Sequence, residues 1–205
     1  MLVAFTTALA RDARAVARWV ALGAGAGAVC GAVIGGLGGR LAMLVLRATS
    51  PDARGLTSDA GFEIGRFTAG GTLSLVAFAA VAGAFGGLAY VAIRSALPAA
   101  ARIPAAALVG ATLGGSAFLE PDGIDLFVLE PLWLAVAAFV GLPAVAAGAT
   151  AHLVERIGAR RGPLALRARV PSAAAIGARA AGTASVLALV AVQGAGLIDE
   201  VATIL

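Results

Sequence analysis

The chain has 205 residues, of which 60% are hydrophobic and only 13% charged, with a net charge of +4 and a mean hydropathy of +0.98. Soluble domains carry charge on about a quarter of their residues, so this composition argues against a water-soluble globular protein. All the basic residues are arginines that flank apolar runs without interleaved aromatic residues, which argues against a nucleic-acid-binding surface.

Five apolar segments are long enough to cross a hydrocarbon core of roughly 30 Å, which takes about 20 helical residues. The sequence therefore predicts an all-α, polytopic membrane helical bundle that forms a single domain over residues 1–205. The predicted spans lie near 19–39, 68–93, 103–119, 132–153 and 180–198. The third is the shortest, because Arg102 and Glu120 bracket only 17 residues. If it does not cross, four spans remain and both termini share a side.

The first predicted span carries a glycine at every fourth position, the pattern of a glycine zipper: Gly23, Gly27, Gly31, Gly35 and Gly39. Small residues let helix backbones approach closely, which is a main source of packing energy in lipid. Packing within the bundle is the favoured interpretation, and a homo-oligomer through the first span is the alternative. Gly83 with Gly87, and Gly110 with Gly114, repeat the spacing in the second and third spans. Cys30 is the only cysteine, which excludes an intramolecular disulfide.

Arg40 follows the glycine stripe and precedes the apolar stretch 41–46. Its side chain either reaches the headgroup region or is a buried guanidinium that needs a carboxylate or an anionic ligand. The connection 48–67 has mixed charge, and the connection 120–130 is acidic. We therefore predict a polar site on the outer face, formed by Arg40, Glu63, Asp122 and Asp125. The acidic connection lacks the spacing of a calcium-binding loop, so no metal site is predicted.

The arginine distribution predicts the orientation, because cytoplasmic loops are rich in basic residues. If the N-terminus is cytoplasmic, 11 arginines lie on the inner side of the membrane and four on the outer side. The predicted setting is the plasma membrane, with the C-terminus on the outer side. Trp19 and Tyr90 then lie at inner span ends and Trp133 at an outer one, as expected for aromatic residues at headgroup level. The arginine-rich inner loop 156–169 is expected to contact anionic lipids.

No catalytic or cofactor-binding motif accompanies these spans. His152 and Glu155 share a helix face, but no H-E-x-x-H zinc motif, G-x-S-x-G elbow, phosphate-binding loop or dinucleotide fingerprint is present, and no cofactor is predicted. The remaining polar groups inside the spans are Thr72, Ser74, Thr112, Ser116, Thr183, Ser185 and Gln193. We interpret the chain as a structural or assembly membrane protein, more readily than an enzyme. A small channel or transporter is the first alternative, and a membrane enzyme with its site on the outer face is the second.

Overall fold

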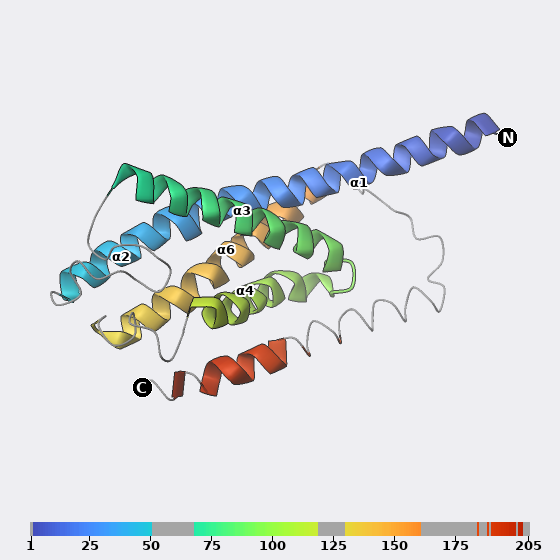
Figure 1. Ribbon diagram of the computed structural model, residues 1–205. Coiled ribbons are helices and arrows are strands. Elements are labelled where there is room, and N and C mark those ends of the chain that lie inside the picture. The colour runs from blue at the N-terminus through green and yellow to red at the C-terminus, as the bar shows by residue number, and fades with distance from the viewer. Residues whose placement is uncertain are drawn as a thin grey trace.

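The computed structural model describes residues 2–50, 68–118, 130–160 and 190–199, together with a few single positions near the C-terminus. Side chains are described from residue 14 onward. Helices make up nearly all of this part of the chain, and it contains no β-strand (Figure 1). The all-α prediction is therefore confirmed.

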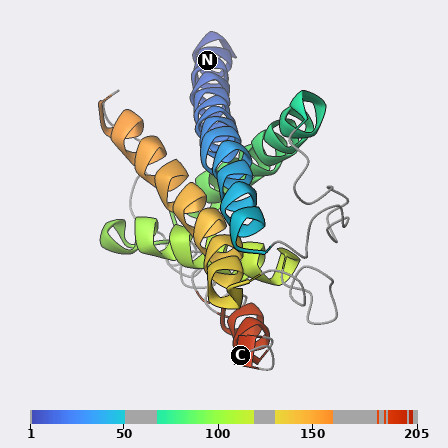
Figure 2. The same cartoon turned by 90° about the vertical axis from the view of Figure 1, so that its left-hand side faces the viewer.

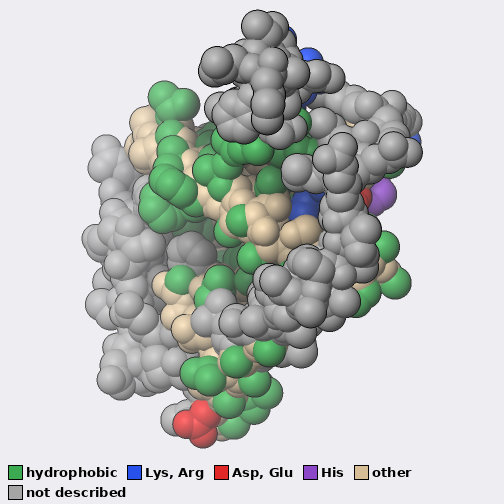
Figure 3. All heavy atoms as spheres, turned by 90° about the vertical axis from the view of Figure 1, so that its right-hand side faces the viewer, with side chains coloured by type: hydrophobic (Ala, Val, Ile, Leu, Met, Phe, Trp, Pro, Cys, Tyr) green, Lys and Arg blue, Asp and Glu red, His purple; other side chains and the backbone are tan. Residues whose placement is uncertain are grey.

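Three helices among the described residues are long and apolar enough to cross a membrane. They are Arg14–Thr49, Ala69–Ile93 and Leu132–Ala159. Their outer surfaces are strongly apolar: Leu73, Phe78 and Phe85 are each at least 60% exposed. Figure 3 shows hydrophobic side chains spread over the described surface of one face, with few charged ones among them. Such a surface suits lipid and not water, which agrees with the predicted membrane bundle.

Two further helices are shorter than a full crossing within the residues that the structure describes. Helix α4 (Arg102–Phe118) has 17 residues, and the apolar helix Val190–Asp199 lies in the predicted fifth span. At 1.5 Å per residue, α4 is about 25 Å long, slightly less than the hydrocarbon core. The count of five crossings therefore stays a prediction.

The first helix is longer than the predicted span 19–39. It runs from α1 (Leu2–Cys30) through a π-helical segment η1 (Gly31–Leu37) into α2 (Gly38–Thr49) without a break. The apolar stretch after Arg40 continues the helix because Leu46 is buried and packs on Ala135 of α6 (Leu132–Arg160). Interhelical packing, and not the arginine, thus decides where this helix ends.

Helix α3 (Ala69–Ile93) packs antiparallel on the first helix through glycines on both sides. A Cβ atom added to Gly27 would lie 2.0 Å from the carbonyl oxygen of Gly83, and one added to Gly87 would lie 2.0 Å from that of Gly23. A Cβ on Gly31 would lie 2.1 Å from the carbonyl oxygen of Ala79. The two backbones therefore touch along three consecutive turns, where only glycine fits.

Helices α4 and α6 form a second antiparallel pair (Figures 1 and 2). The ring of Pro143, inside α6, fills the space left by the missing side chain of Gly114, because a Cβ there would lie 2.2 Å from the proline Cβ. A Cβ on Gly110 would lie 2.5 Å from the Pro143 carbonyl oxygen. Helix α6 also contacts α1, so it joins the two pairs.

The two ends of the bundle are closed by different contacts. At one end, Ala26, Tyr90, Ala151 and Val154 form a buried cluster, and we call this the Glu155 end after the nearby carboxylate. At the opposite end, the hydroxyl of Ser50 donates to the carbonyl oxygen of Glu130 at 3.0 Å and accepts from its N–H at 2.6 Å. We call this the Ser50 end.

Candidate functional site

Arg40 lies near the Ser50 end, and the π-helical segment determines which way it faces. In a π-helix the hydrogen bonds join residues five apart, so residue i+5 follows residue i on the same face. Gly31 and Gly36 are accordingly both buried, and a Cβ on Gly36 would lie 2.7 Å from the Val76 Cα. The closest line of contact with α3 thus passes from Gly31 to Gly36, and four residues later it reaches Arg40.

Gly35 and Gly39, which the sequence places in the same stripe, lie beside this line. A Cβ on Gly35 would meet only the Ala79 Cβ, at 3.3 Å, and one on Gly39 would lie 3.7 Å from a Leu75 methyl group. Both distances are close to ordinary packing, in contrast to the backbone contacts at Gly23, Gly27 and Gly31.

The Arg40 side chain is 7% exposed and lies under the start of α3. A Cβ on Gly71 would be 2.7 Å from its Nη2 atom, and its Nη1 atom is 3.9 Å from the sulfur of Met43. The Arg40 guanidinium is thus enclosed by protein atoms from the first helix and from the start of α3. Its predicted acidic neighbours Glu63, Asp122 and Asp125 lie outside the described residues, so the outer-face site stays a prediction.

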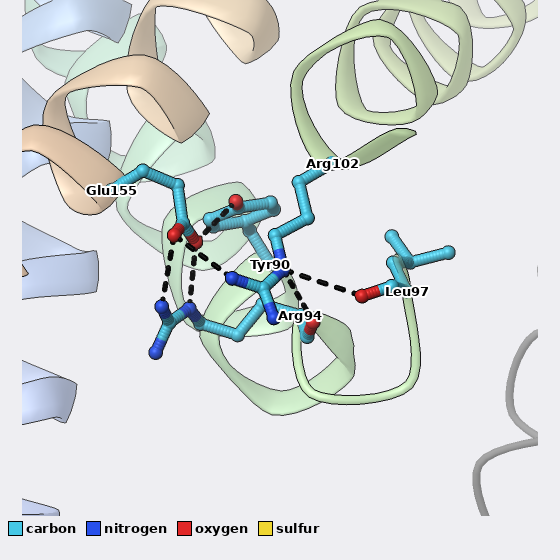
Figure 4. A network of polar contacts seen from close by, with 5 residues as sticks. All are labelled: Tyr90, Arg94, Leu97, Arg102 and Glu155. Atoms are coloured by element: carbon cyan, nitrogen blue, oxygen red, sulfur yellow. Dashed lines mark hydrogen bonds and ion pairs between the residues drawn. The ribbon is translucent and has the colours of Figure 1, made fainter. Parts of the chain in front are cut away.

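The largest polar cluster among the described residues lies at the Glu155 end, opposite the predicted site (Figure 4). Glu155 of α6 accepts hydrogen bonds from the Tyr90 hydroxyl at 2.8 Å and from Arg94 Nε and Nη2 at 2.8 and 3.0 Å. Its second oxygen also accepts from Arg102 Nη1 at 3.0 Å. The guanidinium of Arg94 stacks on the Trp19 ring, 4.0 Å from the centroid. We call these five residues the Glu155 cluster.

Each helix supplies its member of the cluster from the turn next to the bundle end. Tyr90 lies in the last turn of α3, and Arg94 is the residue that caps this helix. Arg102 begins α4, and its Nε donates to the carbonyl oxygens of Arg94 and Leu97 at 3.0 and 3.3 Å. The Arg102 side chain therefore bonds carbonyl oxygens at the end of α3 and in the α3–α4 turn, and it also bonds Glu155 of α6. It can do so because the turn brings the end of α3 next to the start of α4.

The carboxylate of Glu155 is fully used by these contacts. It accepts four hydrogen bonds, three of them from guanidinium groups, which is about the number of acceptor sites that a carboxylate has. A carboxylate in this state is a poor general base and has no site left for a metal. The described residues contain no group of three His, Cys, Asp or Glu side chains placed to hold a metal ion.

From the sequence alone, Arg94 and Arg102 enter only the arginine count that predicts the orientation, Tyr90 is expected at headgroup level, and Glu155 shares a helix face with His152. His152 is exposed, whereas Glu155 turns toward Tyr90 and the arginines. One signal could have found the cluster: Glu155 is one of only two acidic residues among the 11 arginines on the predicted inner side.

Comparisons of the chain with protein-family models, with curated proteins and with solved structures find no match.

Proposed function

We propose that the protein is a structural membrane protein, whose helices form a closed bundle that neither conducts nor transports. The observation that carries this proposal is the set of hydrogen bonds made by the serine and threonine hydroxyl groups within the helices. In a transporter these groups, as the main polar groups inside the spans, would have to face a substrate pathway near the midplane.

Every described serine and threonine hydroxyl in the helices α3, α4 and α6 donates to a backbone carbonyl oxygen three or four residues earlier in the chain. The pairs are Thr72 to Thr68 at 3.0 Å, Ser74 to Gly71 at 3.1 Å, Thr112 to Leu108 at 3.1 Å, Ser116 to Thr112 at 2.8 Å, and Thr150 to Ala146 at 2.8 Å. Such bonds satisfy a hydroxyl inside an apolar helix without any partner from another helix or from water. Of the groups predicted from the sequence, Thr183 and Ser185 lie outside the described residues.

The helix contacts support the same conclusion. Thr112 and Thr150 are each 5% exposed, so protein atoms and not an open lumen surround them. The α1–α3 and α4–α6 contacts are backbone against backbone or proline against glycine, which leaves little room between the helices. A membrane enzyme is supported less, because the one described carboxylate cluster is saturated by its own hydrogen bonds.

The proposal includes the plasma membrane as the setting, with the Glu155 end cytoplasmic. The arginine count supports this orientation, and Arg156, which begins the arginine-rich segment 156–169 within the last turns of α6, is exposed and available to anionic lipids. The glycine stripe gives less support to a homo-oligomer through the first span, since Gly23, Gly27 and Gly31 face α3 of the same chain. A second copy would have to displace α3 from this face.

Cysteine accessibility tests the closed bundle without knowledge of a substrate. Cys30 is buried, so Cys30→Ala provides a background without thiols. In this background we expect Thr112→Cys and Thr150→Cys to resist a membrane-impermeant maleimide added from either side, and Arg156→Cys to react. Labelling of position 112 or 150 from both sides would indicate a channel. Labelling from one side only would indicate a transporter, and either result would overturn the proposal.

A further inference from the structure

We propose that Arg94 and Arg102 form a phosphate-binding site at the Glu155 end, and that the phosphate is that of an anionic phospholipid headgroup. This inference goes beyond the structural role and does not depend on the arginine-rich loop 156–169. It rests on the donors that the Glu155 cluster leaves unused.

Each guanidinium group in the cluster has one terminal nitrogen without an acceptor in the described part of the chain. Arg94 uses Nε and Nη2 on Glu155 and keeps Nη1, while Arg102 uses Nε and Nη1 and keeps Nη2. Figure 4 shows the unused Arg94 nitrogen at the edge of the network, pointing away from the Glu155 carboxylate, and the unused Arg102 nitrogen between the Arg94 side chain and the α3–α4 turn. The two arginine side chains are 20% and 22% exposed, so neither guanidinium-bearing side chain is sealed inside the bundle.

The charge balance favours an anion. Two guanidinium groups share a single carboxylate, which leaves the cluster with one net positive charge. Arg102 is also the first residue of α4, so the positive end of that helix dipole points to the same place. Phosphate oxygens are good acceptors for guanidinium N–H groups, because the bonds are charge-assisted and match the planar arrangement of the donors.

Both guanidinium groups are held in place before any ligand arrives. Arg94 is fixed by two bonds to Glu155 and by the stacked ring of Trp19, and Arg102 by Glu155 and the carbonyl oxygens of the α3–α4 turn. Because most of their rotamer freedom is already lost, binding adds little ordering cost. A structural ion pair would need only one arginine, whereas two arginines that each keep one unused terminal nitrogen suit a ligand with several oxygens.

The position of the cluster favours a lipid headgroup over a soluble phosphate. Trp19 and Tyr90, which typically lie at headgroup depth, belong to the cluster itself. The donors therefore lie at the level where phospholipid phosphates are concentrated. A soluble phosphate compound uses the same chemistry and is distinguished by the experiment.

Trp19 provides a direct reporter of binding. The chain has two tryptophans, and Trp133 is 65% exposed at the opposite end, so Trp133→Phe leaves Trp19 as the only one. In this background, protein in uncharged detergent micelles is titrated with phosphatidylglycerol, phosphatidylcholine or inorganic phosphate, and Trp19 emission is recorded. We expect a saturable change with phosphatidylglycerol that is at least tenfold weaker with phosphatidylcholine and with inorganic phosphate.

Substitutions separate the site from general charge attraction. Arg102→Gln is expected to weaken phosphatidylglycerol binding at least tenfold, while Arg14→Gln, which removes an exposed arginine outside the cluster, changes it less than twofold. If Arg102→Gln does not fold, Arg102→Lys keeps the charge, loses the fixed geometry and is expected to show the same weakening. No saturable change with any ligand, or equal losses at positions 14 and 102, would overturn the site. Equal binding of inorganic phosphate would support the site and overturn its assignment to lipid.

Discussion

Replacement of single glycines in the first helix by alanine tests the close contact with α3. Gly27 and Gly25 are two residues apart in the same helix, but they face opposite surroundings. A Cβ on Gly27 would lie 2.0 Å from the Gly83 carbonyl oxygen, more than 1 Å closer than the 3.4 Å of ordinary contact. A Cβ on Gly25 would meet no atom within 4 Å. The first change must push two backbones apart, and the second adds a methyl group to open space.

The comparison of the two variants isolates the cost of this separation. Both changes gain the same helix propensity, about 1 kcal/mol in favour of alanine, so this gain cancels in the difference. Forcing an extra carbon into a packed contact costs about 1–3 kcal/mol. We therefore expect Gly27→Ala to be less stable than Gly25→Ala by about 1–3 kcal/mol.

Reversible unfolding in mixed micelles, with denaturing detergent as the variable and helical circular dichroism as the signal, measures this difference. Gly27→Leu should enlarge it, because its side chain cannot fit between two touching backbones. Equal unfolding midpoints for the two alanine variants would show that the α1–α3 contact accommodates a methyl group at position 27 without cost, and would refute the packing argument.

Three further predictions follow from particular contacts. Gly36→Ala should lower the unfolding midpoint more than Gly35→Ala, because the π-helical turn places residue 36 against α3, and the opposite order would indicate a regular α-helix there. Glu155→Gln should destabilise the bundle by about 1–3 kcal/mol in the same unfolding assay, since it leaves two partly buried guanidinium groups without their shared carboxylate. Arg156→Gln, which changes an exposed neighbour, should alter stability by less than about 0.5 kcal/mol. Ser50→Ala should cost about 1–3 kcal/mol in that assay, because it removes both hydrogen bonds that the buried Ser50 hydroxyl makes to the Glu130 backbone, and an unchanged midpoint would contradict this role.

The membrane class and the helical fold could be predicted from the sequence alone because they depend on local properties. In lipid every backbone group must be bonded within its own segment, so length and hydropathy are sufficient to place helices. The predicted span 68–93 accordingly matches α3 to within one residue. The predicted span 132–153 begins where α6 begins and lies inside it. The close contacts at Gly23, Gly27 and Gly31 were also predictable in kind, since small residues at a helical repeat favour close approach.

The partners of these residues were decided only by the tertiary structure. Glycine spacing shows that a helix face is flat, but it does not show which helix covers it, and here α3 covers it through Gly83 and Gly87. The regular spacing of four residues also gives no sign of the π-helical turn. This turn changes which helix face the residues after Gly31 occupy, so that Arg40 faces α3. This rotation depends on packing between helices and leaves no mark in composition.

The Glu155 cluster shows the same limit most clearly. The three side chains that donate to Glu155 lie 53 to 65 positions before it in the chain, and each is an ordinary interfacial residue in its own segment. An ion pair forms only where the relative rotation and the ends of three helices bring the charged groups within about 3 Å, because the energy of such a contact falls off steeply with distance and exposure. The sequence by itself determined that this end of the bundle is basic, and only the packing of α3, α4 and α6 decided that one carboxylate would bind two of its arginines there.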